Sequence, residues 1–392
     1  MKKIFIFSVI TYLFLGINTS TNSQNLNEDE KASDEILKVG LLVPLSGEFK
    51  EIGESILRSI KLATKQLNDE KIKIFPKDSK GNAEDSFKAA KDFENLGIKI
   101  VIGPVFYTSL SKLNKIDNIT FISLTNKTQE IPKNIISFGI NFESQLEAIT
   151  KYLLDNKVAK TILLLPDSEF SKQINPIIKN NKYEFFKTHY YDTNPEKLTA
   201  AIEKITNYKQ RKINLKSRVK ILEKSELIKD KNELKKLELK HTLGEINFKS
   251  VLIADFDESL KSVINSFTFA DVSSDRVKFF TFNQWFDESL FNETSFQDLI
   301  FPGINLKNFR KFNKKYYKTF GKRPVEISIL AYDALALIYS TWNNNKTNFK
   351  TERFSSKIGF KGLQGEFIIK NNINKSKLNL YKILNKKFTK IN

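Results

Sequence analysis

The sequence predicts an α/β protein built as two lobes, each around a central and mainly parallel sheet. Short apolar runs typical of strands alternate with amphipathic segments typical of helices, and this alternation occurs in two separate sets along the chain. The length of 392 residues points the same way, because it exceeds what one hydrophobic core usually serves.

The N-terminus has the pattern of an export signal. Lys2 and Lys3 precede an uncharged, mainly apolar run over residues 4–17, which a small polar stretch follows. A run of this length is short for a membrane span, which needs about twenty residues. We therefore expect a cleaved signal peptide over residues 1–23, with an uncleaved anchor as the alternative. A polar leader over residues 24–35 then precedes the mature domain.

The first set of strands and helices starts at residue 38. Between its first two strand-like runs, Ile52, Ile56 and Ile60 recur at a spacing of four, which lines one face of a helix. Four strand–helix repeats within about ninety residues imply parallel strands with helices on both faces. The strands are expected over residues 38–43, 72–75, 98–102 and 120–124.

The second set begins with a helix expected over residues 143–156. A long insert, residues 208–241, lacks Pro and Gly and spreads leucines among many charges, so it predicts one long helix or a helical hairpin. Two roles are open for this insert, a solvated protrusion or an arm that docks a partner. Further strands are expected over residues 161–165, 184–190, 250–254 and 277–282, and helices over residues 258–269, 308–320 and 327–342.

The net charge of +19 is concentrated in two segments. The insert carries twelve Lys or Arg against five Asp or Glu, and residues 370–392 carry seven lysines and no acid. Lysines outnumber arginines by 57 to 7, and arginine is the side chain whose planar fork reads bases and clamps phosphates. We therefore expect no nucleic-acid partner; the lysines decorate solvated faces, with weak attraction to an anionic membrane or polymer as the alternative.

Metal and cysteine chemistry are excluded by composition. The chain has no cysteine, which removes disulfides, thiolate zinc sites, cysteine nucleophiles and lipid attachment to an N-terminal cysteine. Its two histidines, His189 and His241, are far apart in the sequence and have no metal-binding spacing. We expect neither a metal nor a cofactor.

One segment suggests an enzyme. Asp255-Phe256-Asp257-Glu258-Ser259 follows an apolar strand, a spacing that resembles aspartyl-phosphate phosphatases, where one Asp attacks phosphate and the second is the acid/base. The fifth position is Ser rather than the usual Thr, and no convincing downstream acidic pair could hold magnesium. A helix start explains the same acids, which are favoured in a first turn. We expect no enzymatic activity.

Several motifs, taken in order, resemble those of type I periplasmic solute-binding proteins of the leucine/isoleucine/valine-binding branch, over roughly residues 38–385. Within that family, Gly103-Pro104-Val105-Phe106 and the last glycine motif look most like penicillin-binding-protein activators. The motifs are Pro44-Leu45-Ser46-Gly47, Asp78-x-x-Gly81, Ile102-Gly103-Pro104 with Ser109 behind it, Ile122-Ser123-Leu124-Thr125, Ala331-Tyr332-Asp333-Ala334 and Gly359-Phe360-x-Gly362-x-x-Gly365-x-Phe367.

The resemblance implies a type I periplasmic binding fold: α/β, with two Rossmann-like lobes whose central, mainly parallel sheets are joined by a hinge that closes on ligand. It places residues 36–141 and 284–345 in lobe 1, and residues 142–283 and 346–392 in lobe 2. It also implies a monomer in the periplasm.

Ligands of open α/β sheets bind beyond the carboxyl ends of the strands, where helix starts favour a carboxylate. The resemblance implies that Ser109, Ser123 and Thr125 bind the carboxylate of the ligand. In the first loop, Phe49 corresponds to an aromatic lid, and Ser46 is a further ligand-binding candidate. From the second lobe the candidates are Phe170, although Ser171 follows it where the family often has glycine, and Asp255.

Each of these residues also has a structural explanation. Loop hydroxyls are common helix N-caps, and Phe49 starts the apolar stripe of a helix. Trp285 fits packing between lobes as well as it fits ligand stacking.

Two functions follow. One is a receptor that delivers amino acids or similar carboxylate-bearing molecules to the membrane permease of an ABC-type transporter. The other is a regulator of cell-wall synthesis that contacts a synthase and has an empty or vestigial cleft.

Overall fold

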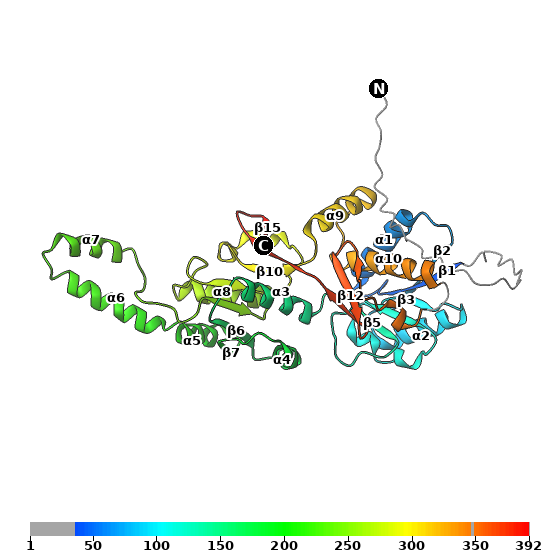
Figure 1. Cartoon of the computed structure of the whole chain (residues 1–392), viewed down its shortest axis with the longest axis horizontal. Coiled ribbons are helices and arrows are strands. Elements are labelled where there is room, and N and C mark those ends of the chain that lie inside the picture. The colour runs from blue at the N-terminus through cyan, green and yellow to red at the C-terminus, as the bar shows by residue number, and fades with distance from the viewer. Residues whose placement is uncertain (1–35, 346–348, 392) are drawn as a thin grey trace, which may run out of the picture. The chain divides into compact units, whose positions relative to one another are not determined.

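The structure, a computed structural model, describes residues 36–345 and 349–391. Two mostly parallel sheets with helices packed around them form the two lobes that the sequence predicts (Figure 1). The expected signal peptide and leader, residues 1–35, lie outside the described residues. None of the described helices is long and apolar enough to cross a membrane.

The first sheet has eight strands in the order β11-β12-β13-β5-β4-β3-β1-β2. Neighbours from β13 to β2 pair in parallel, and β11, β12 and β13 pair antiparallel. The strands are β1 (Leu37–Val43), β2 (Ile72–Asp78), β3 (Ile100–Ile102), β4 (Thr120–Ser123), β5 (Ile135–Ser137), β11 (Phe360–Lys361), β12 (Glu366–Lys370) and β13 (Ile373–Ser376).

The second sheet has seven strands in the order β15-β14-β10-β9-β8-β6-β7. The strands from β10 to β7 run parallel, and the C-terminal pair is added antiparallel. The strands are β6 (Thr161–Pro166), β7 (Lys187–Tyr191), β8 (Ser250–Ile253), β9 (Lys278–Phe280), β10 (Ile300–Gly303), β14 (Asn379–Ile383) and β15 (Phe388–Ile391).

The helices cover these sheets with their apolar faces. In the helix after β1, Ile56, Ile60 and Ala63 are buried, as the spacing of apolar residues predicts. The α-helices are α1 (Lys50–Leu67), α2 (Ala83–Asn95), α3 (Phe142–Asp155), α4 (Glu169–Asn180), α5 (Pro195–Ile205), α6 (Tyr208–Leu222), α7 (Ile228–Leu237), α8 (Asp257–Phe269), α9 (Leu306–Phe320) and α10 (Ser328–Asn345). Short 3-10 helices are η1 (Tyr107–Leu110), η2 (Leu113–Lys115), η3 (Glu288–Asn292), η4 (Thr294–Phe296) and η5 (Thr351–Phe354).

Sheet membership differs from the expected lobe boundaries in two places. Strand β10 belongs to the second sheet, beside β9, although residues 284–345 were expected in lobe 1. Strands β11 to β13 belong to the first sheet, although residues 346–392 were expected in lobe 2. The reason is pairing: the chain crosses between the sheets after β5, after β10 and again between β13 and β14, and strand composition does not reveal which partner a strand finds.

The insert forms a hairpin of α6 and α7. The Arg218 guanidinium donates two hydrogen bonds of 2.8 Å to the Glu233 carboxylate and joins the two helices. At the base of the hairpin, Arg211 is only 2% exposed and donates to the carbonyls of Thr206 (2.9 Å) and Ala270 (2.6 Å) and to the Thr242 hydroxyl (2.7 Å). One buried side chain therefore fastens both ends of the insert to the end of α8.

Candidate functional site

A cavity of about 590 Å³ lies where parallel strands of both sheets end, and we call it the strand-end cavity. Its walls come from the loops after β3, β4, β5, β8 and β9 and from the start of α10. This is the edge at which open α/β sheets bind ligands. The lining residues are Val105, Phe106, Tyr107, Leu124, Thr125, Asn126, Gly139, Ile140, Gln145, Phe256, Asp257, Asn283, Gln284, Trp285, Asp287, Glu326, Ile327 and Leu330.

The charged side chains that line the strand-end cavity are all acidic. Asp257, Asp287 and Glu326 contribute carboxylates, and no Lys, Arg or His is among the lining residues. Asp257 and Asp287 are exposed, whereas Glu326 is half-buried and makes no ion pair with any described residue. Burial raises the pKa of Glu326, and the charge of Asp287 raises it further. A cation bound in the cavity would relieve this repulsion.

The rest of the lining is aromatic and amide-rich. The rings of Phe106, Phe256 and Trp285 face this space together with the side chains of Asn126 and Gln284. Such a mixture of apolar surface and a few polar groups is typical of small-molecule pockets, which commonly measure about 300–1,000 Å³.

The three hydroxyls predicted to hold a carboxylate occupy different environments. Thr125 lines the cavity, and its Oγ1 accepts a hydrogen bond of 3.3 Å from the Lys127 N–H. Ser123 is fully buried and donates to the Pro104 carbonyl at 2.8 Å. Ser109 is also fully buried, and its Oγ has no hydrogen-bond partner among the described residues. Of the three, only Thr125 lines the cavity.

The candidates from the first loop lie one layer behind the cavity. The Phe49 ring packs against Phe106, with ring centroids 4.5 Å apart, and Phe106 lines the cavity. Ser46 donates to the Asp78 carboxylate, which also accepts from the Leu45 N–H at 2.7 Å. The loop hydroxyl is thus used to hold the loop itself.

The second-lobe candidates also support the wall rather than form it. Phe170 packs edge-on against Phe256 with centroids 5.7 Å apart, and Phe256 lines the cavity. The Asp255 carboxylate accepts hydrogen bonds from the Tyr191 hydroxyl, the Ser259 hydroxyl and the Phe256 N–H. Burial, with the charge of Asp255, raises the pKa of the Tyr191 phenol. The ligand-binding roles of Ser46, Phe49, Ser109, Ser123, Thr125, Phe170 and Asp255 stay predictions.

Glu326 and Asp287 are lining residues that the sequence pattern did not single out. Glu326 lies two residues after Pro324 and two before the start of the apolar helix α10, where a lone carboxylate looks like an ordinary helix-start acid. The sequence feature that could have pointed to Glu326 is its position just before a helix that is apolar enough to be buried. Over residues 36–345 and 349–391, no three acidic or histidine side chains are grouped to hold a metal ion.

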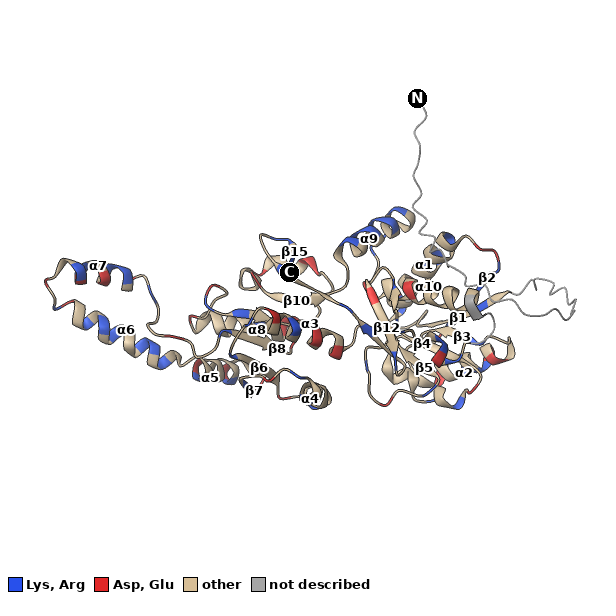
Figure 2. Ribbon diagram, viewed as in Figure 1, with Lys and Arg blue, Asp and Glu red and all other residues tan. Residues whose placement is uncertain are grey.

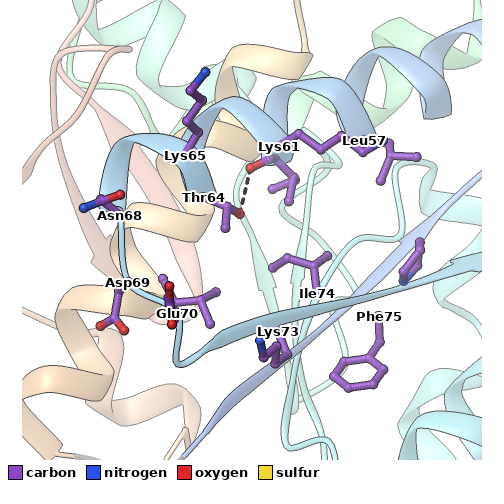
Figure 3. A pocket seen from close by; sticks show the side chains of 13 residues that line it. Leu57, Lys61, Thr64, Lys65, Asn68, Asp69, Glu70, Lys73, Ile74 and Phe75 are labelled. Atoms are coloured by element: carbon purple, nitrogen blue, oxygen red, sulfur yellow. Dashed lines mark hydrogen bonds between the residues drawn. The ribbon is translucent and has the colours of Figure 1, made fainter.

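A second hollow, of about 730 Å³, lies on the outer edge of the first sheet. Figure 3 shows that its side chains come from the C-terminal half of α1, the turn that follows it and the edge strand β2. Leu57, Ile74 and Phe75 give it apolar walls, and the Asp69 carboxylate at its rim accepts from the Tyr339 hydroxyl at 2.9 Å. None of the predicted site residues lines this hollow.

Comparison with solved structures gives the fold a context. The C-domain of LpoA from Haemophilus influenzae, a regulator of PBP1A, is 14% identical with a TM-score of 0.61, over 91% of this chain and 100% of that one. Full-length LpoA from the same organism has the same identity and a TM-score of 0.62, over 91% of this chain and 59% of its own length. The leucine-binding protein LivK from Thermotoga maritima is 12% identical with a TM-score of 0.57, over 91% and 98% of the two chains.

A search of curated protein sequences returned no match. Residues 36–209 match the model of the periplasmic binding protein family, whose members generally bind ligands or regulate partners rather than catalyse reactions and act outside the cytoplasm. The order of the motifs, the two mixed sheets and these likenesses agree: the chain is a protein of the type I periplasmic binding fold, with two lobes.

Proposed function

We propose that this protein is a non-enzymatic, exported receptor that takes a small molecule with a positively charged amino group into the strand-end cavity. The observation that carries the proposal is the charge of the lining: three carboxylates and no basic side chain. Opposite charges stabilise each other most where water is partly excluded, and Glu326 is the half-buried one of the three.

An amino acid is the simplest ligand class that fits both this lining and the sequence motifs. Its ammonium group suits Glu326 and the neighbouring Asp287, and its carboxylate suits the first-lobe loops, where Thr125 lines the cavity. The rings of Phe106 and Trp285 offer apolar surface to the side chain of the ligand. A permease of an ABC-type transporter would be the receiving partner, as for receptors of this fold.

A paired ligand panel tests the amino-group requirement. The thermal unfolding midpoint is measured with leucine, lysine and glutamate and with the deaminated acid of each. A ligand that binds the folded state alone, at about 100 times its Kd, stabilises that state by roughly 2.7 kcal/mol. We expect one or more amino acids to raise the midpoint and the deaminated partners to leave it unchanged. Equal shifts with a deaminated acid would contradict the proposal.

A second function, regulation of an envelope partner, is favoured by the insert. Its hairpin exposes Ile221, Leu227 and Ile228 at 61%, 67% and 79%, and these residues lie in or beside the turn between α6 and α7. Arg211 holds the base of the hairpin against the end of α8, so the hairpin that carries the exposed tip is attached at both of its ends. A cell-wall synthase is the partner that the likeness to LpoA suggests.

Removing the hairpin distinguishes the two functions. Residues 215–238 are replaced by a short Gly-Ser linker, which keeps Arg211 and Thr242 in place. Changing the length of a loop costs only about 0.6 kcal/mol per doubling, so folding and the response to amino acids should survive. If the protein is a receptor, the shortened variant still responds to amino acids and binds no partner less well than the intact protein does. If instead the intact protein captures a purified cell-wall synthase and the shortened one does not, regulation is the function.

A further inference from the structure

We propose that helix α9 is a membrane-docking surface, which holds the protein against a bilayer of anionic lipids through its basic outer face. This proposal does not depend on what the strand-end cavity binds. The net charge of the regions outside residues 208–241 and 370–392 is small, because acidic residues there offset the basic residues of α9.

Helix α9 carries six basic residues and no acidic one. The six are Lys307, Arg310, Lys311, Lys314, Lys315 and Lys318, and all are exposed. In Figure 2 the ribbon of α9 carries blue segments and no red one. None of them forms an ion pair with a described residue; the neighbouring pairs, Glu54 with Arg58 and Glu288 with Arg323, lie outside the helix. The helix therefore presents uncompensated positive charge.

The buried side of α9 fixes which way this charge faces. Phe309, Phe312 and Tyr316 recur at steps of three and four and are 6%, 3% and 0% exposed. The Phe312 ring packs on Tyr332 of α10, with centroids 6.1 Å apart, and the Tyr316 hydroxyl lies 3.3 Å from the Ser55 hydroxyl of α1. Because three buried rings anchor one face, the opposite face must point to solvent.

The spacing of the outer face makes it continuous. Lys307, Lys311, Lys314 and Lys318 follow one another at steps of three and four, so they form one stripe along the helix. Tyr317 sits in the same stretch and is 59% exposed. A phenol ring among lysines is typical of a membrane–water interface, where the ring lies at headgroup level.

A bilayer fits this face better than an acidic protein does. Five of the six cations are lysines, which act as point charges without the planar fork that recognises a single carboxylate. Tyr317 is the one large apolar side chain of α9 with high exposure, so the helix offers a protein partner little apolar surface to bury. Polybasic segments need only a diffuse anionic surface, and each lysine contributes roughly fivefold to binding.

Vesicle binding tests the proposal, with mixed phosphatidylglycerol and phosphatidylcholine vesicles compared with phosphatidylcholine alone. The test variant changes Lys311, Lys314 and Lys318 to Gln. The control changes Lys88, Lys99 and Lys115 to Gln; these are also exposed and without an ion pair, and the net charge falls equally. We expect the wild type and the control to sediment with the anionic vesicles alone, and the test variant to bind on the order of a hundredfold more weakly.

Two further arms complete the test. Tyr317→Ser should weaken vesicle binding severalfold and leave binding to soluble polyglutamate unchanged, because only the bilayer offers an interface for the ring. The proposal is wrong if the control variant loses as much binding as the test variant, since net charge alone would then explain the attraction. It is equally wrong if polyglutamate binds and the anionic vesicles do not.

Discussion

The carboxylate of Asp333 accepts a hydrogen bond of 2.8 Å from the backbone N–H of Gln364. Its other oxygen accepts from the Leu363 N–H at 2.7 Å, and the side chain is 2% exposed. Gly362 precedes these residues, and a Cβ there would meet the Asp333 carboxylate at 2.5 Å. Two motifs that lie about thirty residues apart in the sequence are thus one interaction in the fold, which ties α10 to the hairpin of β11 and β12.

This interaction predicts that Asp333→Asn is destabilising. The amide keeps one acceptor oxygen and replaces the other with an N–H₂ group, so a buried N–H loses its acceptor. An unsatisfied buried polar group costs about 1–3 kcal/mol. The free energy of unfolding in urea, at neutral pH, should fall by about that amount. Asp155→Asn is the matched control, because Asp155 is exposed and pairs only with Lys151, and it should change stability by less than about 1 kcal/mol.

The same carboxyl predicts a dependence of stability on pH. Burial raises the pKa of Asp333 from an ordinary 3.8 to about 6, although the N–H groups of Gln364 and Leu363 oppose the shift. The folded state thus binds this proton more tightly than the unfolded state. Its contribution to stability is full below pH 3.8 and is lost as the pH rises through about 6.

Comparing the wild type with Asp333→Asn isolates this titration, since the amide does not ionise. The free energy of unfolding of the wild type, taken relative to that of Asp333→Asn, should fall by roughly 2–3 kcal/mol between about pH 4 and pH 7. A difference that stays constant across this range would show that the carboxyl does not titrate there.

Arg211 predicts a second large loss of stability. Arg211→Lys leaves one nitrogen to serve the carbonyls of Thr206 and Ala270 and the hydroxyl of Thr242, so two of these groups lose their donor. The expected cost is about 2–5 kcal/mol, measured by urea unfolding and by the rate of tryptic cleavage within the insert. Arg218→Lys, in the more exposed pair with Glu233, should cost less than about 1 kcal/mol. Equal effects of the two changes would contradict the role of Arg211 as the fastening.

The fold was predictable where the signal is local. Apolar periodicity identified α1, whose Ile56 and Ile60 are buried, and the Gly321 stop identified the end of α9. The sheet to which β10 belongs was not predictable, because its pairing with β9 depends on the path of the whole chain. For the insert, sequence left one long helix or a hairpin open, and the contact between Arg218 and Glu233 that joins its two helices is not local.

For the site, the sequence predicts the loops at the carboxyl ends of the strands, and which residues bind a ligand stays a prediction. The loops after the parallel strands do line a cavity, and Thr125 is among its residues. Asp255 is the informative case. An acid that follows a buried strand looks free to bind a ligand, but its carboxylate accepts hydrogen bonds from Tyr191, which is distant in the sequence, and from Ser259, in the next helix. Glu326 shows the reverse, because nothing near it in sequence signals that Asp287 faces the same space.

The most direct measurement of the central claim is a calorimetric titration of the amino acid that shifts the unfolding midpoint most, into the wild type and Glu326→Gln. Glu288→Gln, next to Asp287 but outside the cavity lining, is the control. Losing a charged hydrogen-bond partner costs about 1.5–3 kcal/mol, so Kd should rise about ten- to a hundredfold in Glu326→Gln alone. Acidification protonates Glu326 and removes the charge that attracts the ammonium group. Because the pKa of Glu326 is raised, wild-type affinity should begin to fall at a higher pH, as the solution is acidified, than it would with an ordinary glutamate. Unchanged affinity in Glu326→Gln, or equal loss in Glu288→Gln, would contradict an amine-binding cavity.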